Sequence, residues 1–110
     1  MGYYTTYSLE IVILGQDEIS KEDVIAQFRK SSESAEYALD EDGSSNESCK
    51  WYDSNDDLIK FSKKHLGTLF LLSGTGEESE DLWKLYVRDG KHQVCKARLV
   101  FDEFDEFKMI

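Results

Sequence analysis

Hydrophobic and polar positions alternate along several stretches of the chain, a pattern typical of strands with one buried face. The longest stretch covers residues 3–14, where the odd-numbered positions are the more apolar. Residues 69–72 are apolar at every position, which predicts a central strand covered on both faces. Two further strands are predicted late in the chain. Their predicted inward positions are Trp83, Leu85 and Val87 in the first and Cys95, Ala97, Leu99 and Phe101 in the second.

Helices are predicted between the early strands. Ser20 is a predicted N-cap because Asp23 follows it at the spacing of a capping box, and Ile19 and Val24 have the spacing of a hydrophobic staple. The predicted buried stripe of this first helix is Val24, Ile25 and Phe28.

A second helix is predicted to begin after a cap at Asp53 or Ser54 and to end before Gly67. Its predicted buried positions are Leu58, Phe61 and either His65 or Leu66. Between the two helices, residues 35–39 predict a short strand and residues 40–47 a turn and a polar loop.

The turn at Asp89 and Gly90 joins the last two predicted strands. A two-residue loop there would place Leu85 opposite Val94, and so the inward face of one strand opposite the outward face of the next. An odd-length loop avoids this mismatch. We therefore expect a three-residue loop with Gly90 in the left-handed conformation of a bulge, and Cys95 as a small buried core residue.

Together these elements predict a single α+β domain over residues 1–110, with an acidic tail from about residue 102 to 110. The element order is β-α-β-α-β-β-β. The simplest packing is a ferredoxin-like sandwich, with a mainly antiparallel sheet and both helices on one face. We see no leader segment and no apolar stretch of membrane-spanning length, which predicts a cytoplasmic protein. An unpaired edge strand leaves both a monomer and a homodimer open.

The formal net charge is −10, from 23 acidic and 13 basic residues. This charge predicts a protein partner with a basic surface and argues against nucleic acid and anionic membranes, which it would repel. The candidate partner-binding residues are the clustered acids Asp40, Glu41, Asp42, Glu47, Glu77, Glu78, Glu80, Asp81, Asp102, Glu103, Asp105 and Glu106. The alternative is nucleic acid bound to an open sheet face. Its predicted contacts are Lys84, Tyr86, Arg88, Lys96 and Arg98.

No arrangement of residues predicts catalysis, a metal site or a cofactor. The histidines and cysteines lack the spacing of a zinc site, and the residues around Gly43 do not fit a calcium loop. The glycine-containing stretch 74–76 leads into acids, which would repel a phosphate. We therefore expect a protein that is not an enzyme. The one enzymatic alternative is Cys49, in a polar loop, as a thiol nucleophile.

Several short motifs occur in order between residues 35 and 104. They are K-W-Y-D at 50–53, F-S-K-K at 61–64, G-T-G-E-E at 74–78, then Asp81, Trp83 and Tyr86, and D-G-K at 89–91. In this pattern the chain resembles a family of small, mostly uncharacterised proteins of phages, prophages and their bacterial hosts. The resemblance implies a ferredoxin-like fold and a phage context, and no catalytic residue. By analogy with small acidic phage proteins that inhibit host defence nucleases, it raises the hypothesis of an inhibitor that mimics nucleic acid in the cytoplasm of a bacterial host.

Overall fold

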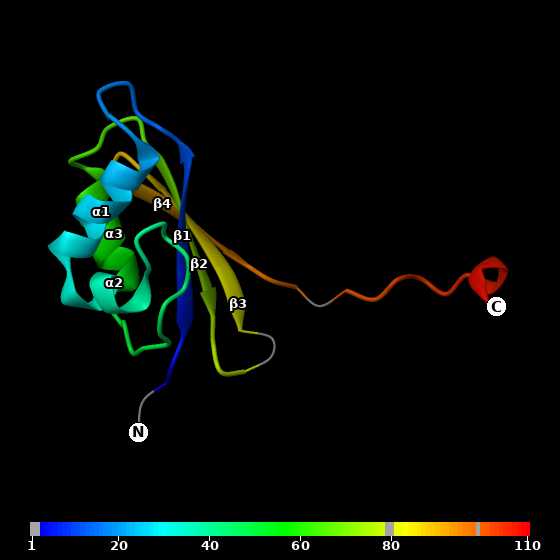
Figure 1. The fold of residues 1–110 in the computed structure, drawn as a ribbon. Helices are drawn as coiled ribbons and strands as arrows, with labels where there is room; N and C mark the ends of the chain where they lie inside the picture. Colours follow the sequence, from blue (N-terminus) through cyan, green and yellow to red (C-terminus); the bar gives the residue numbers. More distant parts are fainter. Residues whose placement is uncertain (1–2, 79–80, 99) are drawn as a thin grey trace.

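A computed structural model describes residues 3–78, 81–98 and 100–110. Within these residues the chain forms one four-stranded sheet with three helices on one face, while the opposite face is open (Figure 1). The strands are β1 (Thr6–Ile13), β2 (Leu69–Thr75), β3 (Leu82–Arg88) and β4 (Lys91–Lys96). The helices are α1 (Lys21–Ser31), α2 (Glu33–Ala38) and α3 (Ser54–Ser62), and a short 3₁₀ helix, η1 (Glu106–Lys108), lies in the tail.

Neighbouring strands pair antiparallel in the order β1-β2-β3-β4. The predicted α+β class, with an antiparallel sheet and helices on one face, is confirmed. The predicted strand count is wrong, because the described residues contain four strands where the sequence suggested five. All three helices lie in the connection between β1 and β2.

Residues 35–39, expected as a strand, form the end of helix α2 and its C-cap. The Ser32 hydroxyl caps this helix by accepting the N–H of Ala35 at 3.4 Å. Ala35, Ala38 and Leu39 are fully buried at a spacing of three and four residues, so they share one helical face. The cap and this periodicity therefore favour a helix over the expected strand.

The core lies between the sheet and the helices. The odd-numbered face of β1 is buried as predicted at Tyr7, Leu9 and Ile11, but Ile13, beyond an irregularity in the pairing, is 49% exposed. Strand β2 lies between β1 and β3, as predicted for a central strand. The predicted stripe of α1 is also buried. The buried apolar residues of the three strands and of α1 and α3 are Tyr7, Leu9, Ile11, Val24, Ile25, Phe28, Leu58, Phe61, Phe70, Leu72, Leu85 and Val87.

The helix ends match the predictions in part. Ser20 caps α1, since its hydroxyl accepts the N–H of Asp23 at 3.1 Å. The predicted staple is wrong, because Ile19 is 87% exposed while Val24 is fully buried. Asp53 is the N-cap residue of α3, but its side chain makes no capping hydrogen bond.

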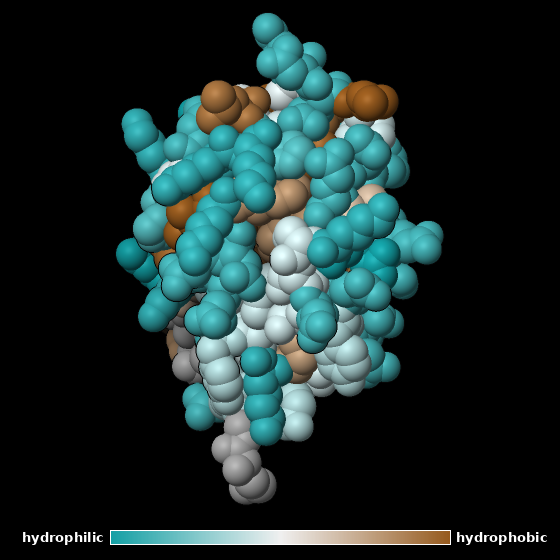
Figure 2. Space-filling model, turned by 90° about the vertical axis from the view of Figure 1, so that its left-hand side faces the viewer, coloured by the Kyte–Doolittle hydropathy of each residue, from teal (hydrophilic) through white to brown (hydrophobic). Residues whose placement is uncertain are grey.

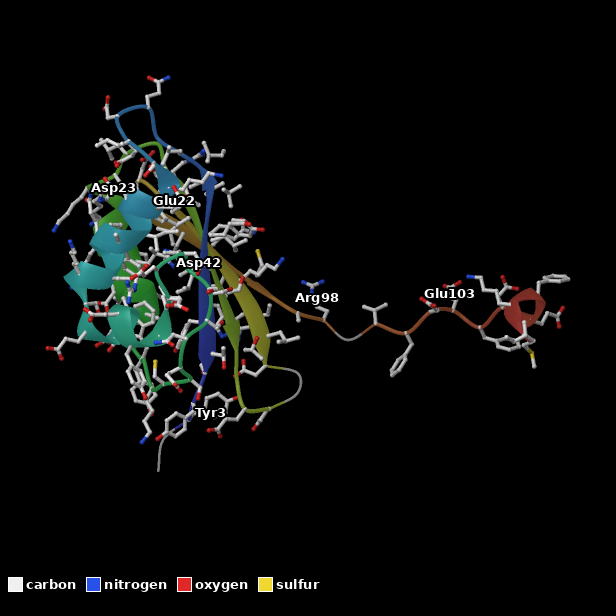
Figure 3. The ribbon with its side chains drawn as sticks, in the orientation of Figure 1. Tyr3, Glu22, Asp23, Asp42, Arg98 and Glu103 are labelled. Carbon is white, nitrogen blue, oxygen red and sulfur yellow. The ribbon has the colours of Figure 1, made fainter. Side chains whose placement is uncertain are left out.

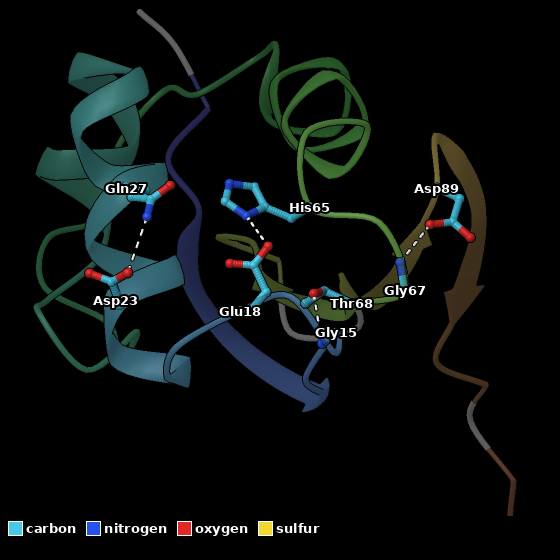
Figure 4. A network of polar contacts seen from close by, with 8 residues as sticks. All are labelled: Gly15, Glu18, Asp23, Gln27, His65, Gly67, Thr68 and Asp89. Atoms are coloured by element: carbon cyan, nitrogen blue, oxygen red, sulfur yellow. Dashed lines mark hydrogen bonds and ion pairs between the residues drawn. The ribbon is translucent and has the colours of Figure 1, made fainter.

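After α3, His65 rather than Leu66 is the buried residue. The His65 ring lies 4.4 Å from that of Phe61, and its Nδ1 lies 2.6 Å from Oε1 of Glu18 (Figure 4). This contact ties the end of α3 to the loop that precedes α1. A second polar contact nearby joins the Gly67 N–H to the Asp89 carboxylate at 2.8 Å, and so links that segment to the β3–β4 turn.

The β3–β4 turn has two residues, not the three expected. Arg88 pairs with Lys91, and both Asp89 and Gly90 have positive φ angles, 52° and 80°. Two successive positive φ angles define a type I′ turn, whose twist matches that of the strands it joins. Val94 therefore does lie opposite Leu85. The mismatch is tolerated because Val94, on the edge strand, stays 43% exposed.

This register reverses the predicted faces of β4. Cys95 pairs with Lys84 on the open face and is not a core residue, whereas Lys96 pairs with Trp83 on the helix-side face. The last strand also ends early, at Lys96. Beyond β4, the Ala97 N–H still donates to the Leu82 carbonyl at 2.9 Å, where β3 begins, but the expected inward positions Ala97 and Phe101 are exposed. Leu99 lies outside the described residues.

The two tryptophans differ in burial. Trp83 lies on the inward face as predicted but is only partly buried, against Gly74 and with its ring centroid 6.0 Å from that of Tyr7. Trp51, in the segment before α3, is 3% exposed and belongs to the core. The main tryptophan of the core is therefore Trp51.

Candidate functional site

The acidic turn Asp40–Gly43 is tied to β1. The Gly43 carbonyl accepts the N–H of Leu9 at 2.7 Å. Within the turn, the Asp42 carboxylate accepts the N–H of Ser44 at 2.9 Å and its hydroxyl at 2.5 Å. These bonds hold the pKa of Asp42 below its usual value. Asp42 therefore stays charged, and the backbone fixes its position.

Asp42 lines a surface hollow of about 430 Å³ together with Glu10 of β1 and Glu22 of α1. One cation, Lys21, also lines it, so acidic groups outnumber basic ones. The other lining residues are Ser8, Leu9, Ile11, Ile25, Gly43 and Ser44. The hollow thus brings Asp42 and Glu22 next to apolar side chains, whereas Glu10 alternates with the buried Leu9 and Ile11 and so lies on the open-face side of β1.

Sequence reasoning missed Glu10 and Glu22 as candidates. Glu10 is an outward position of a strand, and Glu22 lies in the first turn of a helix, where acids are common for local reasons. Neither belongs to an acidic run. Only the tertiary structure brings their segments together with the turn at Asp42: that turn is hydrogen-bonded to β1, the strand that holds Glu10.

The second predicted group of acids bonds to the first residues of the described chain. The Tyr3 hydroxyl donates to Asp81 Oδ2 at 2.6 Å and accepts the N–H of Glu78 at 3.1 Å. Glu77 Oε1 accepts the N–H of Tyr4 at 3.0 Å. The bond to Asp81 raises the pKa of Tyr3. Glu80 lies outside the described residues.

The predicted acids do not gather on one surface. Asp42 lies at the helix side of the sheet, Tyr3 with its acidic partners at one end, and Glu103 far out on the opposite side (Figure 3). Glu47 is exposed in the loop before Cys49. The remaining tail acids, Asp102, Asp105 and Glu106, are exposed as well. The helix side is predominantly hydrophilic (Figure 2).

The basic residues of the open face differ from those predicted. Lys84, Tyr86 and Arg88 alternate along β3 on this face as expected. Lys91 joins them, because it pairs with Arg88. Lys96 does not, since the two-residue turn places it on the other face, and position 98 lies beyond the end of β4.

The described cysteines and metal-ligating side chains offer little support for a thiol nucleophile or a metal site. Cys49 is buried, and burial raises the pKa of its thiol, so less of the reactive thiolate forms at neutral pH. In the described part of the chain, no three His, Cys, Asp or Glu side chains cluster closely enough to hold a metal ion. None of the described helices has the length and apolar character needed to cross a membrane.

The geometry defines a small α+β protein with an acidic hollow on the helix side, an open sheet face and an exposed acidic tail. Comparisons of the chain with family models, with curated proteins and with solved structures found no match. The function has to be inferred from the surface itself.

Proposed function

We propose that this chain is a non-enzymatic binding protein whose acidic hollow receives a lysine or arginine side chain from a protein partner with a basic surface. The observation that carries the proposal is that Glu22 and Asp42, from separate segments, line one hollow that apolar residues also line. A lysine or arginine side chain has an apolar stem and a cationic head. Apolar lining suits the stem, and carboxylates form strong charge-assisted hydrogen bonds with the head.

The net charge of −10 supports the same partner class. This charge attracts basic surfaces over several ångströms and so raises the rate at which the two proteins meet. The attraction weakens as salt is added. Proteins that bind nucleic acid carry such basic surfaces. The resemblance to phage proteins makes a host defence nuclease, blocked at its nucleic-acid-binding surface, the first partner to test. The phage origin, the ferredoxin-like fold and the cytoplasmic location in a bacterial host remain predictions.

Capture experiments with two neighbouring variants test the role of the hollow. Glu22 and Asp23 both lie in the first turn of α1, but only Glu22 lines the hollow. Glu22→Lys and Asp23→Lys change the net charge equally and disturb the helix dipole similarly. Immobilised parent and variant proteins are exposed to a bacterial host lysate at increasing salt, and captured proteins are quantified by mass spectrometry.

We expect Glu22→Lys to weaken capture of the partner about tenfold or more, and Asp23→Lys to leave it nearly unchanged. Capture by the parent should decline as ionic strength rises. Equal losses in the two variants would mean that overall charge, and not the hollow, governs binding. Capture that ignores salt would contradict the proposal altogether.

The second candidate function is nucleic-acid binding on the open face. It is favoured by the row of Lys84, Tyr86 and Arg88 along β3, with Lys91 beside it on β4. A mobility-shift assay at low salt with single-stranded DNA and RNA tests it, because such binding has a strong electrostatic component. No shift at micromolar protein would exclude this candidate.

A further inference from the structure

The tail, residues 100–110, leaves the domain on the open side of the sheet and extends away from it (Figure 1). Its aromatic residues Phe101, Phe104 and Phe107 are 83%, 81% and 91% exposed. They recur every third position, separated by pairs of acids. Exposed aromatic residues in this number are typical of a binding segment whose partner is absent.

The open face carries a hollow of about 420 Å³ close to where the tail begins. Most of the residues that line it belong to this face, namely Leu82, Lys84, Cys95 and Ala97, together with Ser73 and Thr75 of β2. Gly74, Trp83 and Lys96, at positions that alternate onto the helix side, also line it. Ala97 immediately follows β4, so the hollow and the root of the tail adjoin. No described element covers it.

The charges of the tail and of the open face are complementary. Among the charged residues of this face, Lys84, Arg88 and Lys91 outnumber Glu10. The tail has four acids, Asp102, Glu103, Asp105 and Glu106, and one cation, Lys108. Within a protein of net charge −10, the open face is thus a surface that suits an acidic aromatic segment.

The tail cannot easily reach the hollow of its own chain. To insert Phe104, the chain would have to reverse direction between Ala97 and Phe104. That stretch contains no glycine, proline, asparagine or serine, and Asp102 is its one residue of a type that favours tight turns. Extended, the seven residues after Ala97 span roughly 23 Å, at about 3.3 Å per residue, which is enough to reach a second molecule.

We propose that the tail of one copy binds the open sheet face of a second copy, with Phe104 in the hollow and its flanking carboxylates against Lys84 and Arg88. Since each tail projects from its own open face, two copies that face each other exchange tails reciprocally. The result is a closed dimer with two identical contacts. This site is separate from the acidic hollow and does not depend on the function proposed for it.

Charge reversal on each side tests the pairing. One variant reverses the face, with Lys84→Glu and Arg88→Glu, and a second reverses the tail, with Glu103→Lys and Asp105→Lys. In the proposed dimer each variant alone opposes like charges, whereas a mixture of the two restores both contacts. A control, Lys30→Glu with Lys64→Glu, makes the same change as the face variant at exposed positions away from the open face.

Sedimentation of the purified chains at several concentrations measures the outcome. We expect the parent and the control to form dimers, each reversed variant to associate about tenfold or more weakly, and the equimolar mixture to recover the parent's affinity. A parent that stays monomeric at the highest soluble concentration would overturn the proposal. Reversed variants that dimerise like the parent, or a mixture that fails to recover, would overturn it too.

Cysteine cross-linking locates the contact. In Phe104→Cys, the new cysteine should form a disulfide with Cys95 of a second copy under mild oxidation, since Cys95 lines the hollow. Adding Cys95→Ala should abolish this link, while the buried Cys49 remains as an internal control. A Cys95 link within one chain, or none at all, would contradict exchange between copies. So would a monomeric protein whose open face instead binds single-stranded nucleic acid.

Discussion

Removal of the Trp51 side chain is the sharpest test of how this fold is held together. The indole contacts Tyr7 of β1 and Phe28 of α1, with ring centroids 5.1 Å and 5.7 Å away. Its N–H donates to Oδ2 of Asp57 in α3 at 2.8 Å. A single side chain from an irregular segment therefore joins the sheet to two helices.

The cost of its loss follows from this burial. Replacing a fully buried aromatic residue with alanine costs about 3–5 kcal/mol, and a domain of this size has only about 5–15 kcal/mol in total. Trp51→Ala should therefore lose a large fraction of its stability. Trp51→Phe keeps much of the packing but removes the shorter of two hydrogen bonds to Asp57 Oδ2, which keeps only the Ser32 hydroxyl at 3.4 Å. We therefore expect an intermediate loss of about 1–3 kcal/mol.

Urea denaturation followed by circular dichroism measures these free energies of unfolding, and the fluorescence of the remaining Trp83 provides a second probe. Trp83→Ala is the matched comparison, and it should cost less because Trp83 is only partly buried. The reasoning fails if Trp51→Ala unfolds at the same urea concentration as the parent. It also fails if Trp83→Ala proves the more damaging change.

Three further predictions follow from local geometry. Gly74→Ala should lower stability by about 1–3 kcal/mol in urea denaturation, because the added methyl group would overlap the Trp83 indole. Burial raises the pKa of Tyr7 above 10.0, so the neutral phenol contributes stability that is lost as pH rises through that raised pKa. Near neutral pH, Tyr7→Phe should be about 1 kcal/mol less stable than the parent, because the hydrogen bond from the Tyr7 hydroxyl to the Trp51 carbonyl is lost. Above pH 10.0, the stability of Tyr7→Phe should decline less steeply than that of the parent, which urea denaturation at several pH values measures. At concentrations too low for the proposed dimer to form, a thiol reagent should modify Cys95 readily and Cys49 only after denaturant is added; equal rates would contradict the difference in burial between the two cysteines.

Patterns among residues close together in the sequence were sufficient to predict several strands and helices. Alternation in β1 predicted its buried face, because side chains in a strand point alternately to opposite sides. The Ser20 hydroxyl predicted the start of α1, because a cap depends only on residues a few positions apart. The apolar run in β2 predicted a central strand, and the helix-spaced residues of α1 predicted its buried stripe.

The structure of residues 35–39 and the face on which Cys95 lies depended instead on contacts with other parts of the fold. The pattern at residues 35–39 is short enough to fit a strand or a helix, and the cap at Ser32 together with burial against the core favours the helix. Cys95 is a core residue only if the turn at Asp89 and Gly90 has an odd number of residues, and the two-residue turn places it on the open face instead.

For the candidate site too, some features follow from the sequence alone and others only from the tertiary structure. Net charge and acidic runs are properties of composition, and by themselves they indicate the class of partner. The hollow, however, requires Glu22 of α1 to meet Asp42 of the turn after α2, and the whole of α2 lies between them along the chain. Sequence alone determined the charge and the periodic elements of this protein. The tertiary structure decided which carboxylates share a surface and which sheet face stays open, because both depend on contacts between distant segments.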